Sequence, residues 1–330
     1  MDEILLSHGA GGRDYRELVE EVFLPAYGSV QLNKLQDAAI CDTEGPIAFT
    51  TDGFVVNPLF FPGGDIGSLS VSGTVNDLAV SGAYPLYLSV SMIIEAGFPL
   101  EQLRRIAQSI ASTAREAGVS IVTGDTKVVE QGKGEGIYIT TSGVGTLSQR
   151  RNVLQTVHPG DAVILSASIA NHGMAVMAAR EKLEIEPLPV SDARPLNGLI
   201  DAVLAHGIPV HAMRDPTRGG IAATLCEWVK PDIDLIIEEN QIPVLPNVRS
   251  LCNLLGLDPI YVANEGVCIF AVPNDWKEET LYLLRSHPYG KQAACIGQAV
   301  RGEGDVVLHT VYNTKRRIFL PAGELLPRIC

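Results

Sequence analysis

The sequence has few aromatic side chains and comparatively little positive charge. Of its 330 residues, 6% are aromatic, and 25 Lys and Arg stand against 38 Asp and Glu, which gives a formal net charge of −13. Binding to nucleic acid or to an anionic membrane surface requires clustered Lys and Arg. The composition therefore argues against both kinds of partner. A phosphate-bearing substrate would need metal cations to mediate its contact with so acidic a chain.

Long apolar runs and paired cysteines are also missing. No stretch approaches the roughly 18 consecutive apolar residues of a membrane helix, and the opening MDEILLSHGAGG lacks the pattern of a signal peptide. The six cysteines are scattered, with no CxxC pair. We therefore expect a cytoplasmic protein with reduced thiols and without a cysteine-based zinc or iron–sulfur site.

Several common catalytic and nucleotide-binding motifs are absent as well. The sequence contains no GxxxxGKS/T, no GxGxxG after a strand, no HExxH and no GxSxG. Their absence excludes a P-loop protein. What remains is rich in Asp and Gly, which favours nucleotide binding through metal ions instead of a P-loop lysine.

What is present is a regular alternation of helical and strand-like patterns. PLYLSVSMIIE and GVCIFAV are typical of strands, and LEQLRRIAQSIASTAREAG carries apolar residues at helical spacing. Alternation in both halves predicts an α/β or α+β fold with two domains of similar size. A polar segment with a Pro-Gly turn indicates a junction near residue 150. We expect an N-terminal domain over residues 1–150, a C-terminal domain over 151–312 and a flexible tail over 313–330.

Three aspartates stand in one apolar, glycine-rich block, TTDGFVVNPLFFPGGDIGSLSVSGTVNDLAVSGAYP. Carboxylates in such surroundings are costly unless something pairs with them. Mg²⁺ takes hard oxygen ligands and would bridge Asp52, Asp65 and Asp77 to phosphate oxygens. Asp52 and Asp77 could be turn formers or helix caps, and any one of the three aspartates alone would favour a structural role. Three in one block favour a functional site.

Two glycine-containing segments are candidates for binding phosphate. The loop SHGAGGRDY contains Gly11 and Gly12 before a predicted helix, so its backbone N–H groups could approach an anion, or it could be a flexible loop. VTGDTKVVE leaves a strand through Gly124 and presents Asp125 and Lys127. Lys127 could bind phosphate, or transfer a proton if burial lowers its pKa; the alternative is an ordinary turn with a solvated lysine.

The second half contributes two further candidates. In RDPTRGGIAATLCEW, Asp215 is predicted to cap a helix that begins at Pro216, and that cap would explain the aspartate sufficiently. Arg218 and the two glycines after it also suit an anion. In VANEGVCIF, Asn264 and Glu265 precede a predicted strand. Glu265 could act there as a general base, or be part of an ordinary turn.

Seven segments, in this order, resemble the family of ATP-binding proteins that includes aminoimidazole ribonucleotide (AIR) synthetase and selenophosphate synthetase. They are SHGAGGR, TTDGFVVNPLFFPGGDIG, GTVNDLAVSGA, GDTKVV, RDPTRGG, NEG and the terminal PRIC. The resemblance spans essentially the whole chain and is strongest to the HypE branch, the carbamoyl dehydratases of hydrogenase maturation. Two departures, IIEAGF and the serine of SVSGTVND, fall on no candidate residue.

The resemblance implies a two-domain fold like that of AIR synthetase, the PurM-like fold. Its N-terminal domain would form a shared β-barrel in a homodimer, followed by a C-terminal α/β domain and an extended C-terminal tail, with ATP in the cleft towards the C-terminal domain. The residues matched to Mg²⁺ ligands are Asp52, Asp65, Asp77 and Asp215. The residues matched to the surroundings of the nucleotide are Gly11, Gly12, Asp52, Gly64, Asp65, Ile66, Asp77, Gly124, Asp125 and Asn264.

The resemblance also gives the terminal Cys330 a role. In such proteins this thiol receives a carbamoyl group from HypF, ATP phosphorylates the carbamoyl oxygen, and loss of a proton leaves an S-cyanated cysteine. The cyano group becomes a cyanide ligand of NiFe-hydrogenase iron through a HypC–HypD complex. Metal-held ATP suits the phosphoryl transfer, and either Glu265 or Lys127 would take the proton. A tail of eighteen residues spans roughly 60 Å at about 3.3 Å each, so Cys330 could visit both HypF and its own ATP cleft.

Two alternatives remain open from the sequence. The chain could be a small-molecule ATP-dependent ligase or kinase of the same fold with Cys330 incidental, although SHGAGGRDY lacks the Cys expected of a selenophosphate synthetase. It could also be a non-enzymatic scaffold with a degenerate nucleotide cleft. The intact set of acidic residues argues against such decay.

Overall fold

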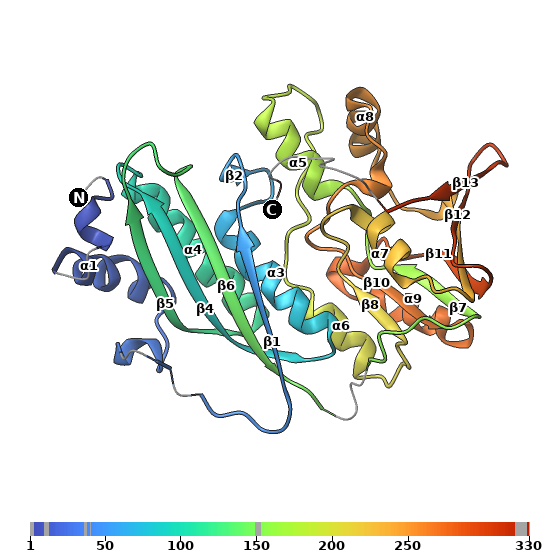
Figure 1. Ribbon diagram of the computed structural model, residues 1–330, viewed down its shortest axis with the longest axis horizontal. Coiled ribbons are helices and arrows are strands. Elements are labelled where there is room, and N and C mark those ends of the chain that lie inside the picture. The colour runs from blue at the N-terminus through green and yellow to red at the C-terminus, as the bar shows by residue number, and fades with distance from the viewer. Residues whose placement is uncertain are drawn as a thin grey trace.

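The computed structural model has two lobes, each built around its own β-sheet (Figure 1). The N-terminal lobe holds a four-stranded sheet and the C-terminal lobe a seven-stranded sheet. The mixed α/β architecture predicted from the alternating patterns is confirmed. The residues that the structure describes are 3–9, 13–35, 38–39, 41–148, 153–320 and 329.

The sheet of the N-terminal lobe mixes antiparallel and parallel pairs. Its strands are β1 (Ile47–Phe54), β4 (Tyr84–Glu95), β5 (Ser120–Val129) and β6 (Ile137–Thr146). Their order is β1-β6-β4-β5, and only the β4–β5 pair among them is parallel. A short hairpin of β2 (Phe60–Phe61) and β3 (Gly64–Asp65) leads into the first long helix.

Two helices, α3 (Ile66–Val80) and α4 (Leu100–Ala117), cover one face of this sheet (Figure 1). α4 is amphipathic, because only one of its faces packs against the rest of the lobe. It ends at Gly118, whose φ of +70° is a left-handed conformation that glycine adopts without steric cost. The buried stripe of α4 includes Leu103, Ile106, Ala107, Ile110 and Ala114.

The opposite face of the sheet carries apolar side chains that a single chain leaves exposed. Phe49 on β1 is 67% exposed and Ile93 on β4 is 43% exposed. Such a surface is typical of an interface between protein chains. The N-terminal segment near the sheet forms α1 (Arg13–Leu18), a π-helical turn (Val19–Phe23) and α2 (Leu24–Tyr27).

The C-terminal lobe is built on a mainly antiparallel sheet. Its strands are β7 (Asp161–Leu165), β8 (Ala212–Arg214), β9 (Ile233–Glu238), β10 (Ile269–Pro273), β11 (Ala294–Arg301), β12 (Val306–His309) and β13 (Lys315–Ile318). Their order is β13-β12-β9-β11-β7-β10-β8. The helices of this lobe are α5 (Asn171–Arg180), α6 (Asn197–Leu204), α7 (Gly220–Trp228), α8 (Pro246–Leu255) and α9 (Lys277–Ser286).

The first residues of the predicted C-terminal tail form a strand instead. A tail is predicted from residue 313, but β13 pairs antiparallel with β12 and places the Ile318 side chain in the core, where it is 4% exposed. A tight turn closes this hairpin, with Thr310 N–H donating to the Thr314 carbonyl at 2.8 Å. The predicted start at residue 313 is therefore wrong, because the preceding strand continues into a hairpin that buries Ile318.

α3 lies where the two lobes meet. It packs on β1 and β6 in the N-terminal lobe and against α6 and β8 in the C-terminal lobe. The apolar cluster of the N-terminal lobe also takes in Val176, Ala263 and Ile329 from later parts of the chain. Side chains of α3 can therefore contribute to a site formed by both lobes. Within the described ranges, no helix combines the length and apolar character that crossing a membrane requires.

Candidate active site

Three carboxylates from three elements meet in a small cavity where the lobes join. Asp52 comes from β1, Asp77 from the middle of α3, and Asp215 from the segment that follows β8. The cavity has a volume of about 30 Å³. Its lining is completed by Gly53, Phe54, Gly73, Thr217, Arg218 and Glu265. The structure thus brings together residues that are up to 213 positions apart in the sequence, from Asp52 to Glu265 (265 − 52).

The electrostatics of this cavity are those of crowded negative charge. Burial, together with the charges of Asp77 and Asp52, raises the pKa of Asp215 to about 8. Burial also raises the pKa values of Asp52 and Asp77. Two contacts offset part of this cost: Thr50 donates to Asp77 at 2.8 Å, and the Arg218 guanidinium lies 3.6 Å from Asp52.

These donors suit a hard divalent cation. Carboxylate oxygens are the ligands that Mg²⁺ prefers, and a bound cation would offset the burial and the neighbouring negative charges that raise the pKa of Asp215. The cavity is of the size of one or two water molecules and is too small for a nucleotide. The three aspartates therefore fit a metal ion beside a larger substrate.

Asp215 is not the helix cap that the sequence predicts. The helix after it, α7, begins only at Gly220, and its N-cap is Gly219 with a φ of +74°. The predicted helix start at Pro216 is wrong, because a left-handed turn over two glycines intervenes. Capping therefore does not explain Asp215, which faces the cavity instead.

Asp65, by contrast, is a helix cap. Its Oδ1 accepts the backbone N–H groups of Gly67 at 2.8 Å and Ser68 at 3.0 Å, and its Oδ2 accepts the Ser109 hydroxyl at 2.5 Å. Its carboxylate does not line the aspartate cavity. Helix α3 thus uses one carboxylate oxygen of Asp65 and Ser109 of α4 uses the other, so the structure does not group Asp65 with the other three aspartates.

Packing also explains the positions of Gly64 and Ile66, the two neighbours of Asp65. Ile66 is fully buried and donates its N–H to the Leu59 carbonyl at 2.9 Å. A side chain on Gly64 would meet the Phe61 ring and the Ser68 hydroxyl at 3.0 Å. Neither residue lines the aspartate cavity, so the structure gives them a role in starting α3.

Asn264 and Glu265 are adjacent in sequence but differ in role. Asn264 is buried, accepts the Ala170 N–H at 2.7 Å and donates to the Pro216 carbonyl at 2.9 Å. It thereby fixes the loop after Asp215, and the prediction that it contacts the nucleotide gains no support from its contacts. Glu265 is 3% exposed and lines the aspartate cavity.

Gly124, Asp125 and Lys127 lie on β5, at the opposite edge of the sheet from β1. Gly124 lies at the level of Asp52 in the strand register, and three strand spacings of about 4.8 Å put it roughly 14 Å from Asp52 within one chain. Lys127 lies three residues further along β5. The Lys127 ammonium lies 2.7 Å from Asp125, and this hydrogen bond raises the pKa of Lys127. Lys127 was expected to act as a base only if burial lowered its pKa. Its pKa is raised instead, so this condition is not met.

A second and larger cavity lies beside β4 and β5. Its volume is about 1130 Å³, and its lining includes Gly124, Asp125, Arg13 and Arg16. Its size matches or exceeds that of typical small-molecule sites, roughly 300–1,000 Å³. Packing alone also explains why position 124 is a glycine, because a side chain there would collide with the Val90 carbonyl of the neighbouring strand.

Gly11, Gly12 and Cys330 lie outside the described residues. The residue before Cys330 is described: Ile329 is 4% exposed, and its carbonyl lies 2.8 Å from Nε2 of His172. The sequence did not single out His172, although a histidine inside the apolar pattern of SIANHGMAVMA is an unusual core residue. Ile329 is thus held against α5 and the apolar cluster of the N-terminal lobe.

Asn76 is a second residue that sequence reasoning missed. Its side-chain amide donates to the carbonyls of Arg194 at 3.1 Å and Glu265 at 3.3 Å, and its oxygen accepts the Leu196 N–H at 2.7 Å. It stands next to Asp77 in α3. Asp77 thus points at the cavity, while the neighbouring Asn76 fixes the loop that carries Glu265.

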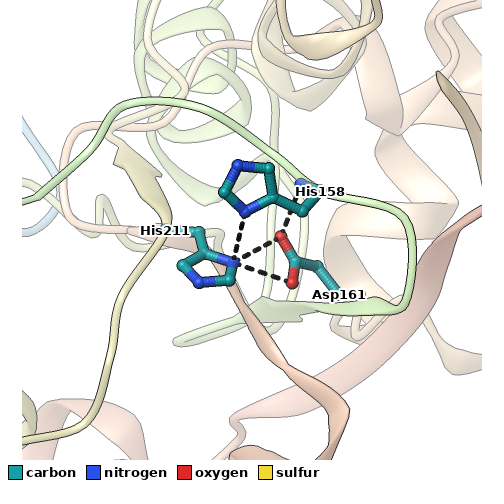
Figure 2. A group of neighbouring side chains, drawn as sticks. All are labelled: His158, Asp161 and His211. Carbon is teal, nitrogen blue, oxygen red and sulfur yellow. Dashed lines mark hydrogen bonds and ion pairs between the residues drawn. The ribbon is translucent and has the colours of Figure 1, made fainter. Parts of the chain in front are cut away.

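Away from this site, His158, Asp161 and His211 form a compact group (Figure 2). Asp161 is buried and accepts the His158 backbone N–H at 2.7 Å, while Nδ1 of His211 lies 2.9 Å from one of its oxygens. The three side chains could hold a metal ion, but the hydrogen bonds within the group account for the arrangement by themselves. Its role in the fold is to join the start of β7 to the start of β8.

The chain matches two family models that together cover most of its length. Residues 35–147 match the AIR synthase related protein, N-terminal domain, and residues 158–309 match the AIR synthase related protein, C-terminal domain. The carbamoyl dehydratase HypE of Rhizobium leguminosarum bv. viciae is 48% identical over 98% of this chain and 94% of its own. The chain belongs to the HypE family.

Solved HypE structures have the same fold. A crystal structure of the hydrogenase maturation protein HypE in complex with ATP superposes with a TM-score of 0.94 at 40% identity, covering 99% of both chains. A HypE–HypF complex matches with a TM-score of 0.81 at 46% identity, covering 92% of this chain and 99% of that one. The PurM-like two-domain fold is confirmed, and family membership favours the carbamoyl dehydratase over the small-molecule ligase or kinase.

Proposed function

We propose that this chain dehydrates a carbamoyl group carried on the thiol of Cys330, using ATP, to give an S-cyanated cysteine for hydrogenase maturation. Membership of the HypE family supports this reaction, and a HypE relative binds ATP. The observation that carries the proposal is the cavity in which Asp52, Asp77, Asp215 and Glu265 meet.

In this proposal the three aspartates hold Mg²⁺ and the phosphate end of ATP. The metal supplies neutralisation of phosphate charge when it is bound. Asp52, Asp77 and Asp215 provide oxygen donors from both lobes, so they would also fix the lobes around the substrate. Arg218, beside Asp52, adds a cation at the same rim of the cavity. An acidic chain can thereby accept a polyanion.

The reaction is balanced as follows. The carbamoyl oxygen takes the γ-phosphoryl group of ATP and ADP leaves; the resulting C–O–phosphate bond then breaks, releasing phosphate, and the nitrogen loses its protons as the carbon–nitrogen triple bond forms. We assign Glu265 as the base that accepts a proton from nitrogen, because it is buried at the cavity. Lys127 is assigned a different part, as a fixed positive charge, because its hydrogen bond to Asp125 raises its pKa.

The proposed partners follow the reaction. A HypE relative is solved in complex with HypF, which would load Cys330, and a HypC–HypD complex would accept the cyano group. We place the protein in the cytoplasm, where the described cysteines, all free thiols, would stay reduced.

We also propose a homodimer through the open face of the N-terminal sheet. Phe49 and Ile47 on β1 are 67% and 54% exposed, and Ile93 on β4 adds to the same face. Burial of such side chains against a second copy would form the shared barrel. Asp125 and Lys127 lie on the β5 edge of this sheet, so a dimer formed there would bring a second chain near them.

Mass spectrometry of the C-terminal peptide tests the proposed reaction. Full-length protein is incubated with HypF, carbamoyl phosphate and ATP, and the peptide that ends in Cys330 is followed over time. We expect a carbamoyl addition and then an ATP-dependent loss of one water. Absence of any modification while HypF is active would refute the assignment of Cys330.

Two variants define the roles of the thiol and the base. Cys330→Ala should keep nucleotide binding but abolish loading and hydrogenase maturation, whereas Cys41→Ala, the matched removal of another thiol, should change neither. Glu265→Gln should be loaded normally and then accumulate without losing water. Normal dehydration by Glu265→Gln would remove Glu265 from the base role.

A further inference from the structure

His172 is a fully buried histidine of α5 whose two ring nitrogens both have partners. Nδ1 lies 2.8 Å from the Ser191 hydroxyl, and Nε2 lies 2.8 Å from the Ile329 carbonyl. Burial lowers the pKa of His172 to about 4, so the ring is neutral near pH 7 and carries one N–H. The Phe61 ring packs edge-on against it, with the ring centroids 5.4 Å apart.

The directions of these hydrogen bonds follow from the chemistry of the groups. A carbonyl oxygen only accepts, so the single N–H of His172 is on Nε2 and donates to Ile329. Nδ1 is then an acceptor, and the Ser191 hydroxyl donates to it. The same hydroxyl oxygen accepts the Ala193 backbone N–H at 3.0 Å. A chain of hydrogen bonds, each donated towards the next group, therefore runs from Ala193 through Ser191 and His172 to Ile329. This chain fixes the tautomer of His172 that carries its proton on Nε2.

Ile329, the penultimate residue, is held by its side chain as well as by its carbonyl. It is 4% exposed and belongs to the apolar cluster that also contains Phe61 and Val176. Burial of an aliphatic side chain and a buried hydrogen bond to the same residue are two separate stabilising interactions. The fold thus contains a shaped site for the residue that precedes Cys330.

This site is connected to the loop that carries Glu265. The Ser191 N–H donates to the Pro62 carbonyl at 2.8 Å, and the next residue, Asp192, accepts the Glu265 N–H at 3.4 Å. Gly266 packs directly on the Asp192 carbonyl, where a side chain would collide. The segment that orients the imidazole therefore also contacts the residue assigned as the base.

We propose that His172 and Ser191 form a docking site for Ile329, which returns the loaded Cys330 to the aspartate cavity. The inference rests on the proposed function, in which Cys330 carries the carbamoyl group. His172 is a positioning residue, because it touches the tail backbone and not the reacting atoms. When the tail is away at HypF, the buried Nε2–H of His172 loses its acceptor, and this loss favours the docked state.

A two-stage assay tests the docking site. Full-length protein is incubated with HypF, carbamoyl phosphate and ATP, and one mass-spectrometric time course gives the rate of carbamoyl addition to Cys330 and, separately, the rate of the later loss of water. For His172→Phe we expect loading at the wild-type rate but dehydration about tenfold slower, the effect of losing one buried hydrogen bond. His172→Gln, whose amide N–H can donate, should recover part of the rate. Wild-type dehydration by His172→Phe would overturn the proposal.

A matched pair on the tail side separates docking from general stability. Ile329 and Ile318 are both 4% exposed, but Ile318 packs in the core of the C-terminal lobe. We expect Ile329→Ala to slow dehydration after loading and Ile318→Ala to leave the rate per folded molecule unchanged. Equal slowing by both substitutions would contradict a specific site for Ile329.

A spectroscopic measurement tests the contact without the reaction. In ¹⁵N-labelled full-length protein, the ring N–H signal of His172 should be protected from exchange with water and should lose protection in Ile329→Asp. An unchanged signal would overturn the docking site. Because this measurement needs no carbamoyl group, a wild-type chain that is never loaded would refute the proposed function while the docking contact is still judged on its own.

Discussion

The carboxyl groups of Asp77 and Asp215 lie so close together that the charge of Asp77 raises the pKa of Asp215. Burial is the larger cause, and together they bring this pKa to about 8, against an ordinary value of 3.8. Between these two values the folded chain holds a proton that the unfolded chain has lost. The metal-free protein should therefore lose stability as pH rises from about 4 to about 8.

The first prediction is that Mg²⁺ removes this pH dependence. Burial raises the pKa of Asp192 to about 6, which acts in the same direction at lower pH. Thermal unfolding with a chelator should show a falling midpoint as the pH increases through this range, and saturating Mg²⁺ should flatten the part of the curve above about pH 6, which is due to Asp215. Asp215→Asn should flatten it without metal. A midpoint that rises with pH in the chelated wild type would contradict the arrangement of the three aspartates.

The second prediction contrasts two aspartates from the same block of sequence. Asp77→Asn should leave the fold intact and weaken Mg²⁺-ATP turnover at least tenfold, because it removes a charged ligand from the cavity. Asp65→Ala should instead lower the free energy of unfolding by about 1–2 kcal/mol, since it removes the N-cap of α3. An ATP-hydrolysis assay with Mg²⁺ and denaturant unfolding measure the two effects, and unchanged turnover in Asp77→Asn would exclude it from the site.

The third prediction concerns the open face of the N-terminal sheet. Phe49→Glu places a charge in the proposed dimer interface and should shift the protein to monomers, as measured by sedimentation velocity. Tyr282, on α9, is 70% exposed, close to the 67% of Phe49, so Tyr282→Glu is the matched control and should stay dimeric. A dimer that survives Phe49→Glu would place the interface elsewhere.

The fourth prediction concerns the group in Figure 2. Asp161→Asn removes the charged acceptor of two hydrogen bonds from a buried position and should cost about 1–3 kcal/mol of stability. His158 is exposed, and His158→Ala should cost less than about 1 kcal/mol. Addition of Zn²⁺ to the wild type should leave the unfolding midpoint unchanged, since the group is satisfied by its own hydrogen bonds.

Local pattern was enough to predict much of the secondary structure but not the exact place where segments end. The apolar spacing of Leu100–Ala117 and the stop at Gly118 predicted α4 closely, because a helix stripe and a glycine end are local signals. The start of α7 was missed, since Pro216 imitates a first helical turn while the chain turns over Gly219 and Gly220 first. The strand β13 was missed because residues 315–318 carry no clear strand pattern. They pair with β12 through burial of Ile318 in the folded core, which the sequence alone does not show.

For the site, the sequence indicated which residue types belong to the chemistry but not which of them meet. Asp65 and Asp77 look alike in one glycine-rich block, yet only the fold shows that α3 takes the first as a cap and points the second at the cavity. His172 escaped notice because its partner, Ile329, lies 157 positions away. Lys127 was kept as a base because its exposure and its pairing with Asp125 cannot be read from GDTK alone.

Gly266 leaves no space between its backbone and the carbonyl of Asp192. The loop that bears Glu265 is therefore in direct contact with the segment that bears Ser191 and Asp192. A displacement of that segment, where the penultimate residue binds, would also act on the position of Glu265. The substitution Gly266→Ala would place a Cβ atom against the Asp192 carbonyl and would push the Glu265 loop away from the segment that bears Asp192.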